Sequence, residues 1–588
     1  MKKYIWILIS CMLMQSCVDT VILPDDKTVD EDFWQSKSDV SLMVNGAYQS
    51  MLSSSLMLNL YVWGDFRSDE LVQNTSITNT SLTEITAANM ETDNSFADWS
   101  TLYYVINNCN IVLDKAPGVM DIDPSYTEGD YLADRSQMLA LRSLCYFYLV
   151  RVFRDVPYSG TAFMVSSQDL NLYQSPPDSV LNCCIADLEE AAENALAPDA
   201  YSDWRRVGWF NQDGIYALLA DIHLWLGAVL HDDEHYQKCV DYCTLIIESK
   251  QDQHTTKPGE VEDEDMIYPL EDGSDVYTEL YINQNAEESI FELQFDGTNN
   301  SNTGLCQALY KYSSSASYGY FYASSIFGAN SGAAGTSMSG STTRLFDQYG
   351  DYRYLNAVYG HGTSSSEESY EESYSVRKMV ENAEYNFTPS SSVSGQKATN
   401  TRAYTYYSQN YIVYRLTDVM LMKAEALTEL ADDDTDTERL YEAFALVQAV
   451  NNRSLSDTWL QNDSLRWKSW NTKDLLEPLI LAERMRELCF EGKRWYDLLR
   501  FNYRHVDGID YSTTLAEQSE NGVSFVSNYS DMLDLMTRKY SSGASSVQAK
   551  MRTEPYLYMP ISEDEMEVNP NLKQNPVYSS GDTYEKNI

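Results

Sequence analysis

The sequence is poor in basic residues. It has 41 Lys and Arg against 88 Asp and Glu in 588 residues, which gives a formal net charge of −47. A protein that binds nucleic acid carries a basic face that pairs with phosphates, and no such cluster is visible in this chain. The composition therefore excludes nucleic acid as a partner, and it favours a neutral ligand or a cation over an anion.

The motifs of common enzymes and metal sites are missing as well. None of the six His lies in an HExxH pattern, and the chain has no GxSxG elbow, no P-loop and no GxGxxG. No CxxC pair occurs among the ten Cys. His231, His235, Cys239 and Cys243 are spaced by four, but such a ladder rotates along a helix face, so we expect packing rather than zinc. We predict no cofactor, and a calcium ion at the acidic surface stays open without an assigned place.

Long apolar runs are scarce, and the one at the N-terminus carries a signal. Tyr4 to Met14 follows two lysines and is too short to span a bilayer. Ser16 directly before Cys17 resembles a lipobox, so we predict cleavage before Cys17 and acylation of this residue; an ordinary secretory peptide is the alternative. Two or more acyl chains anchor a protein stably, because each buried methylene contributes about 0.8 kcal/mol. No later stretch reaches about 18 consecutive apolar residues, so we expect lipid to be the only anchor.

Tyrosine is present in excess. The chain has 45 Tyr, 17 Phe and 11 Trp, which together make 12% of its residues. A Tyr ring offers an apolar face for stacking and a hydroxyl at its rim, and sugar rings combine apolar faces and polar edges in the same way. Tyr is also ordinary packing material, so the composition favours a carbohydrate ligand without locating its site.

Helical periodicity dominates the chain on both sides of a long irregular segment. Pairs of helices joined by short polar turns are typical of tetratricopeptide-like units. Residues 251–405 are instead acidic and rich in Ser, Gly, Tyr and Asn, with a strand-like run at 289–295, and residues 503–550 form a second irregular segment. An irregular region of this length usually has a function. We expect helices at 38–51, 96–113, 132–153, 179–196, 211–230, 234–249, 411–430 and 437–452, and a further pair within 475–501.

Several motifs, taken in chain order, resemble those of one protein family. The N-terminal ones are Phe33-Trp34, residues 44–48 (VNGAY) and residues 64–70 (GDFRSDE). The most specific is residues 482–488 (AERMREL), followed by residues 490–500 (FEGKRWYDLLR). With the lipobox, they make the chain similar to the SusD/RagB family of Bacteroidetes surface glycan-binding lipoproteins over nearly the whole mature chain.

The resemblance implies both a fold and a function. The fold is mostly α: a SusD-like α-α superhelix with tetratricopeptide-like helix pairs and large irregular loop inserts. The function is capture of oligosaccharide at the cell surface and its delivery to a partner SusC-like TonB-dependent transporter of the outer membrane, with the lipoprotein acting as a lid and not as an enzyme. A RagB-like lid that captures peptides, a glycoside hydrolase and a purely structural surface protein are the alternatives.

Five segments follow from the resemblance and the composition. The N-terminal helical region and the C-terminal helical region flank a loop-rich insert, which we expect to hold the ligand-binding region. The segments are 1–16, the lipoprotein signal peptide; 17–32, the lipidated tether; 33–250, the N-terminal region; 251–405, the insert; and 406–588, the C-terminal region.

Charged residues in the most specific motif have two interpretations. Glu483, Arg484, Arg486 and Glu487 are spaced so that they can pair along one helix. The alternative is a pair of catalytic carboxylates, of the kind that glycosidases use. Because ion pairs keep carboxylates ionised while a general acid needs a raised pKa, we expect a structural role.

The resemblance places ligand contacts in three loops, and packing is the alternative for each residue. If the segment around Tyr320 is an extended strand, Tyr318, Tyr320 and Tyr322 lie on one face of it. The candidate ligand-binding residues are Trp63, Asp65, Arg67 and Asp69 in the first loop, Tyr318, Tyr320 and Tyr322 in the second, and Arg377 and Tyr404 in the third.

Overall fold

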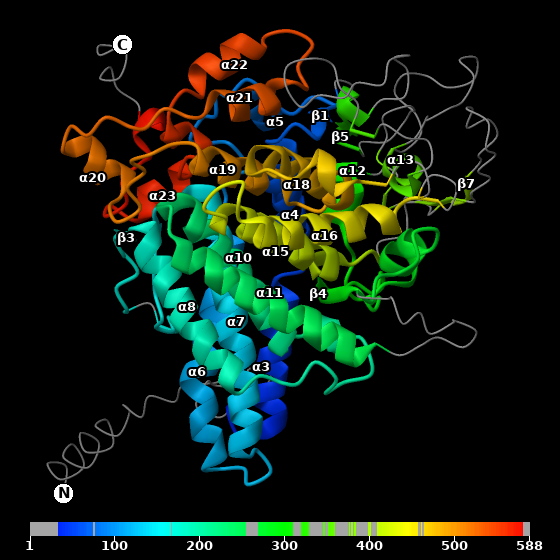
Figure 1. Ribbon diagram of the computed structural model, residues 1–588. Helices are drawn as coiled ribbons and strands as arrows, with labels where there is room; N and C mark the ends of the chain where they lie inside the picture. The colour runs from blue at the N-terminus through cyan, green and yellow to red at the C-terminus, as the bar shows by residue number, and fades with distance from the viewer. Residues whose placement is uncertain are drawn as a thin grey trace, which may run out of the picture.

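Helices make up most of the structure, as the periodicity predicts (Figure 1). The structure is a computed structural model that describes residues 33–579 with internal gaps. The residues outside its description are 1–32, 75–76, 166, 255–267, 310–318, 328–344, 347–350, 359–375, 377, 380, 384–397, 402–407, 457–459, 461–463 and 580–588.

The N-terminal region is built from helices with three short strands. Its helices are α3 (Lys37–Ser50), α4 (Ser54–Tyr61), the π-helix η1 (Val62–Phe66), α5 (Thr80–Thr86), α6 (Ser100–Met120), α7 (Glu128–Phe153), α8 (Pro177–Glu193), α9 (Arg205–Gly208), α10 (Gln212–Leu230) and α11 (Asp233–Gln253). Its strands are β1 (Leu71–Gln73), β2 (Val156–Pro157) and β3 (Gln174–Ser175).

The middle and C-terminal parts contain the remaining elements. The middle part has η2 (Thr278–Asn283), β4 (Ser289–Leu293), α12 (Thr303–Leu309), β5 (Phe321–Ala323), η3 (Ser325–Phe327), α13 (Tyr352–Ala357), β6 (Glu381–Ala383) and β7 (Ala398–Thr401). The C-terminal part has β8 (Tyr411–Arg415), α15 (Leu416–Leu430), α16 (Thr437–Arg453), η4 (Trp467–Ser469), α18 (Lys473–Leu488), α19 (Arg494–Arg504), α20 (Leu515–Glu520), α21 (Ser530–Thr537), α22 (Ala544–Lys550), η5 (Glu554–Leu557), α23 (Glu563–Val568) and η6 (Pro576–Tyr578).

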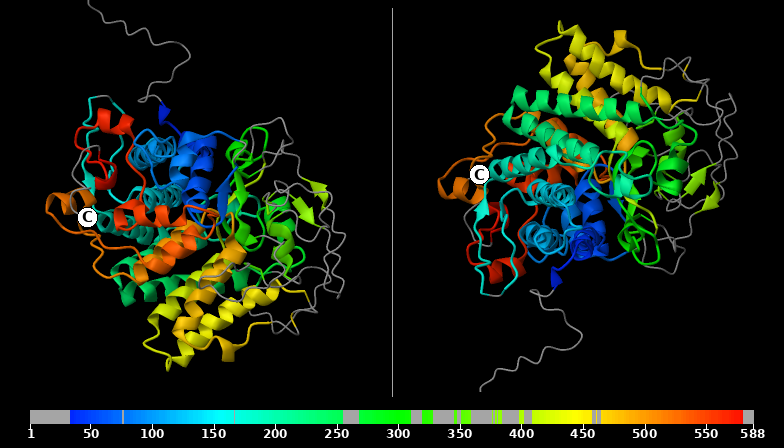
Figure 2. Two further views of the ribbon diagram at one scale, coloured as in Figure 1. Left: turned by 90° about the horizontal axis from the view of Figure 1, so that it is seen from above. Right: turned by 90° about the horizontal axis from the view of Figure 1, so that it is seen from below.

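Helices adjacent in the chain pack side by side in layers. Helices α6, α7, α8, α10 and α11 follow one another through the body, and α11 packs on α15, which in turn packs on α16 (Figures 1 and 2). The first turn of α7 is closed by a capping box between Thr127 and Asp130. From Ser136 to Phe153 the helix is buried on every side, which explains why its sequence is apolar without a polar stripe.

The turn between α10 and α11 shows how a predicted helix pair is made. His231 ends α10 in the left-handed conformation, with φ of +52°, and the side chain of Asp232 accepts a hydrogen bond from the backbone of Glu234 to start α11. A Cβ atom on Gly227 would lie 2.9 Å from the ring of Tyr236, so glycine allows the two helices to approach closely.

The strands form four antiparallel two-stranded sheets in the described part of the chain. The strand predicted at 289–295 is observed as β4, and its partner is β8. The prediction of a helix over 411–430 is wrong at its start, because Tyr411–Arg415 is strand β8 and the helix begins at Leu416. A short run of apolar and aromatic residues does not distinguish a buried strand from a buried helix, and here the pairing with β4 decides.

One further prediction needs correction. Residues 503–550 are not irregular throughout, because α20, α21 and α22 lie there; helices of six to eight residues are too short to show a clear period. In the described part, the stretch Arg205–Leu230, which contains α9 and α10, is long and apolar enough to span a membrane by composition, although 89% of its most apolar window is buried within the protein.

Candidate functional site

Two residues predicted as ligand contacts in the first loop are buried in the core. The indole of Trp63 is fully buried and donates a hydrogen bond of 2.9 Å to the backbone carbonyl of Phe96. The guanidinium of Arg67 donates to the carbonyl of Leu557 at 2.7 Å and lies 4.4 Å above the ring of Trp495. Both side chains therefore hold distant segments together and offer no surface to a ligand in this structure.

The acidic residues of the same loop are buried as well. Asp65 accepts a hydrogen bond of 2.9 Å from the backbone of Gly492, and Asp69 pairs with Arg494 at 2.9 Å and with Arg538 at 2.6 Å. Burial opposes ionisation of Asp69, but the two guanidinium groups outweigh it and lower its pKa to about 2. The packing interpretation therefore describes all four candidates of the first loop.

The backbone turn that meets this loop requires glycine on both sides. Gly492 has a φ of +75°, and a Cβ atom there would lie 2.1 Å from the hydroxyl of Tyr411. A Cβ atom on Gly64 would lie 2.1 Å from the carbonyl oxygen of Gly492. The two family motifs that contain these glycines are thus in direct backbone contact.

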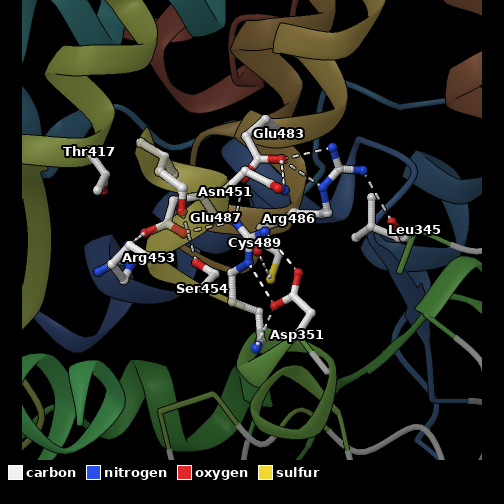
Figure 3. Close-up of polar contacts among 12 residues, drawn as sticks. Leu345, Asp351, Thr417, Asn451, Arg453, Ser454, Glu483, Arg486, Glu487 and Cys489 are labelled. Atoms are coloured by element: carbon white, nitrogen blue, oxygen red, sulfur yellow. Dashed lines mark hydrogen bonds and ion pairs between the residues drawn. The ribbon is translucent and has the colours of Figure 1, made fainter. Parts of the chain in front are cut away.

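The acidic residues of α18 belong to a buried network of ion pairs (Figure 3). Glu483 pairs with Arg353 at 2.7 Å and with Arg486 at 2.8 Å, so the predicted pairing along the helix is confirmed for Arg486. Glu487 pairs with Arg353 at 3.1 Å and with Arg415 at 2.6 Å. Most of the partners come from other elements, since neither Arg353 nor Arg415 lies in α18.

Arg484 also has its partners outside its own helix. Its guanidinium pairs with Asp418 at 3.0 Å and with Asp497 at 2.9 Å, which joins α18 to α15 and α19. Burial opposes ionisation of Asp418, but the cations Lys493 and Arg484 outweigh it and lower its pKa to about 2. The role of Arg484 is therefore to orient three helices.

The pKa shifts of the α18 carboxylates do not suit a general acid. Burial opposes ionisation of Glu483 and Glu487, yet the surrounding guanidinium groups outweigh it and hold both pKa values below the usual range. A glycosidase acid needs a raised pKa so that it keeps its proton near neutral pH. The structural interpretation of these carboxylates is the one that the geometry supports.

The ladder of His and Cys along α11 does not converge on one point. His231 bonds through Nε2 to backbone carbonyls near the end of α19, at 2.9 and 3.1 Å. His235 faces His223, with 2.8 Å between their Nδ1 atoms, and the sulfurs of Cys239 and Cys243 are buried 3.9 Å apart. In the described part of the chain, no group of three or more His, Cys, Asp or Glu is arranged to hold a metal ion.

Tyr320, directly before β5, and Tyr322, within β5, are less buried than the candidate residues of the first loop. Phe321 and Ala323 are each 1% exposed, whereas Tyr320 and Tyr322 are half-buried, so the alternation predicted for an extended strand is observed for this pair. The backbone N–H of Asn74 donates a hydrogen bond of 2.8 Å to the carbonyl of Tyr320, which extends the pairing of β1 with β5. Both side chains therefore lie on the face of the strand opposite to Phe321, and Tyr320 also packs partly against the hydrophobic core.

Phe66 of the first loop packs against the buried side of β5. Phe66 stacks on Phe321, with ring centroids 4.6 Å apart and an angle of 26° between the planes. The ammonium group of Lys539 donates to the carbonyls of Phe66 and Leu71 at 2.6 and 3.0 Å. The family motif around Gly64 therefore positions β5, and sequence reasoning missed Lys539 because it lies in a segment with no periodic pattern.

The remaining predicted residues lie outside the described part of the chain. They are Cys17, Tyr318, Arg377 and Tyr404. Their predicted roles stay predictions, and the candidate site that the structure describes consists of the Tyr320 and Tyr322 face.

Known families match both halves of the chain. The family model described as "SusD family" matches residues 287–578, and that described as "Starch-binding associating with outer membrane" matches residues 23–224. Two SusD-like proteins of Formosa agariphila are each 26% identical to this chain, over 530 and 524 residues. These alignments cover 84% and 85% of this chain and 90% and 91% of the relatives.

Solved structures share the fold. A SusD superfamily protein from Parabacteroides distasonis has a TM-score of 0.63 at 19% identity, and one from Bacteroides thetaiotaomicron has 0.61 at 20% identity; each comparison covers 93% of this chain and 99% of the other. NanU of B. fragilis has a TM-score of 0.60 at 16% identity, with 95% and 100% covered. By its sequence matches and its fold, this chain belongs to the SusD family.

Proposed function

We propose that this protein is a cell-surface lipoprotein that binds oligosaccharide and delivers it to a SusC-like TonB-dependent transporter, over which it acts as a lid. SusD-like proteins are binding proteins rather than enzymes, and one of the matching descriptions names starch binding and association with the outer membrane. The observation that carries the proposal is the pair of half-buried rings of Tyr320, directly before β5, and Tyr322, within β5, on the face opposite to Phe321.

The chemistry of this face suits a neutral sugar. Side chains two residues apart on one face of a strand are about 7 Å apart, so two rings form a continuous aromatic strip along which sugar units stack. The buried Phe321 between them and the stack on Phe66 hold the strand in place before ligand arrives. The net charge of −47 favours a neutral glycan over an anionic one.

The place of the protein in the cell follows from the N-terminal signal. Acylation of Cys17 would hold the body at the outer membrane, and a tether of residues 17–32 would let it move relative to a transporter. A lid needs such a hinge, since it must open to collect ligand and close to release it into the barrel.

Affinity gels that contain neutral plant, host or microbial polysaccharides test the proposal. The mature chain without its acylated Cys17, residues 18–588, should be retarded by at least one glycan. Tyr320→Ala or Tyr322→Ala should weaken binding about fivefold, because aromatic stacking contributes about 0.5–1.5 kcal/mol. Tyr173→Ala is the matched control, since Tyr173 is 71% exposed on another part of the surface.

Three results would change the assignment. Retardation that survives both substitutions would keep the function and discard this face as its site. Binding of peptides without retardation by any glycan would make the protein a peptide-capturing lid. Release of reducing ends that disappears when one carboxylate is replaced would make it a glycoside hydrolase.

A further inference from the structure

A second group of aromatic rings reaches the surface between α8 and α10. Trp204 is 46% exposed, although most of the Trp side chains in the described part of the chain are buried or half-buried. Trp209 meets it edge to face, with centroids 6.0 Å apart and planes at 82°, and Tyr201 meets Trp209 at 5.5 Å and 88°. The three rings belong to one short segment of the chain, YSDWRRVGW at 201–209.

The exposed indole has a rigid support. Trp209 stacks on Tyr48 of α3, with centroids 6.4 Å apart and planes at 19°. Arg206 donates to the backbone carbonyls of Asn285 and Ala286 at 2.8 and 3.0 Å, which fixes α9 against the segment before β4. A ring held in this way loses little freedom when a ligand binds, so its contacts are realised as affinity.

Planar polar groups flank the indole. A Cβ atom built on Gly208 would lie 2.8 Å from the indole of Trp204 and 2.6 Å from Cγ of Gln294, so both side chains border this glycine. The amide of Gln294 donates to the side chain of Asn285 at 2.8 Å and accepts from that of Asn410 at 3.1 Å. These bonds fix the orientation of an amide beside the exposed ring.

The cation in this cluster is already neutralised. The guanidinium of Arg205 lies 4.1 Å above the ring of Tyr201 and pairs with Asp203 through two bonds, at 3.0 and 2.8 Å. Its charge is therefore balanced, and the pair presents planar donors and acceptors rather than a site for an anion.

We propose that Trp204, in one cluster with Trp209, Tyr201 and Arg205 and with Gln294 on the other side of Gly208, forms a second carbohydrate-contacting site that stacks one pyranose ring of a neutral glycan. The proposal rests on the glycan-binding function proposed above. A pyranose has an apolar face for the indole and hydroxyls at its rim for the amide and the ion pair. A protein partner fits less well, because one indole supplies at most about 250 Å² while a stable interface needs about 800 Å² per partner.

The two sites lie on different parts of the body. In Figure 1 the segment that leads from α8 to α10 runs through the lower half of the view, whereas β5 lies near the top. A polysaccharide contacts both sites at once if it is long enough, and a short oligosaccharide occupies one. Simultaneous contact raises the affinity for the polymer without changing either site.

The test uses the polysaccharide that retards the wild-type mature chain and a short oligosaccharide derived from it. Trp204→Ala should weaken binding of the polysaccharide about fivefold or more, and Trp204→Phe should retain most of it, because a phenyl ring still stacks. Tyr173→Ala is the control for loss of an exposed aromatic residue. Because Trp204 is 46% exposed and packs edge to face on Trp209, its variants should lose only a small part of the stability, which calorimetry checks.

A spectroscopic measurement identifies the site directly. Titration with the glycan should change the tryptophan emission of the wild-type chain, and the part of this change that Trp204→Phe removes belongs to Trp204. Gly208→Ala should displace the indole, because its new methyl group would lie 2.8 Å from it, and so it should weaken binding while Trp204 is still present.

The results separate this proposal from the assigned function. Normal retardation of Trp204→Ala by a polysaccharide whose binding Tyr320→Ala weakens would overturn the second site and leave the function intact. An emission change that is identical in Trp204→Phe would overturn it too. If no glycan retards the wild-type chain, the glycan-binding function fails and the second site fails with it.

Discussion

The carboxylate of Asp69 lies 2.9 Å from the guanidinium of Arg494, although 425 residues separate them in the chain. Both residues belong to motifs by which the sequence resembles its family, one near each end. The ion pair closes the body by joining the loop after η1 to the start of α19. The resemblance predicts Asp69 as a ligand contact, but in the structure Asp69 forms a buried ion pair between the N-terminal and C-terminal regions.

Loss of this carboxylate should destabilise the protein strongly. Asp69→Ala leaves the buried Arg494 and the half-buried Arg538 without their partner, and loss of one member of a buried ion pair costs about 3–5 kcal/mol. Urea unfolding should show the loss in the free energy of unfolding. Glu190→Gln is the control, because it removes the exposed pair with Arg135 and should cost about 1 kcal/mol or less. Equal effects of the two substitutions would contradict the assigned role of Asp69.

Two glycines should differ sharply in their tolerance of alanine. In Gly64→Ala the new methyl group would lie 2.1 Å from the carbonyl oxygen of Gly492, so backbone must move and we expect a loss of about 3 kcal/mol or more. Gly46 lies in α3 with nothing within 4 Å of a built Cβ, so Gly46→Ala should stabilise by about 1 kcal/mol. Thermal unfolding of the two variants measures the difference, and similar melting temperatures would contradict it.

The buried carboxyl of Asp65 should make stability depend on pH. Burial raises its pKa to about 7, although the hydrogen bond from Gly492 lowers the pKa. The other carboxylate oxygen has no hydrogen-bond partner in the described part of the chain. Between about pH 4 and pH 7 the folded state holds a proton that the unfolded state has released, so this group makes the protein less stable as pH rises through that window.

Asp65→Asn isolates this effect. The amide oxygen still accepts the bond from Gly492 but carries no charge, so the variant should gain stability relative to the wild type as pH rises, with the full gain above about pH 7 and none below about pH 4. Urea unfolding at several pH values measures the difference. Asp93→Asn, at an exposed position, is the control and should show no such trend. If the free energies of unfolding of Asp65→Asn and the wild type differ by the same amount at every pH, the prediction is wrong.

Buried residues of the first loop should affect stability and not ligand affinity. Trp63→Phe removes the donor to the carbonyl of Phe96 and leaves that group unsatisfied, which costs about 1–3 kcal/mol. The folded variant should bind the glycan as the wild type does, because Trp63 has no exposed surface. Calorimetry and affinity gels give the two values, and a weakened affinity at unchanged stability would restore Trp63 as a ligand contact.

Replacement of Cys17 should release the protein from the membrane. Cys17→Ala removes the acylated thiol, so the exported chain should move from the outer-membrane fraction to the soluble fraction. Immunoblots of the separated fractions measure this, with Cys109→Ala as a control, because Cys109 is buried in α6. Retention of Cys17→Ala in the membrane fraction would contradict the lipid anchor.

Part of the fold is readable without the structure. The helices at 211–230 and 234–249 are found within a few residues of their observed bounds, because apolar residues recur with the helical period and a polar turn separates them. The strand at Tyr411–Arg415 could not be predicted from the sequence, because it forms by pairing with β4, more than a hundred residues earlier.

The candidate site, too, could be predicted only in part from the sequence. Alternation along a strand was enough to place Tyr320 and Tyr322 on one face. Nothing near Trp63 or Asp69 in the sequence shows that they are buried, because the groups that contact them come from elsewhere in the chain. Asp69 pairs with Arg494 of α19 and with Arg538 after α21, and Trp63 contacts Phe96 and Phe153. The exposed ring of Trp204 is equally hidden from sequence, since Trp209 five residues later packs against the body.

The sequence by itself determined the helical character, the net negative charge and the family, and it predicts an N-terminal signal. These features depend on composition and on patterns of neighbouring residues. Only the tertiary structure decided which charged residues are buried and which aromatic rings reach the surface. The physical reason is that a charge enters the interior only together with its partner, and the partner of Asp69 is Arg494, at the other end of the chain.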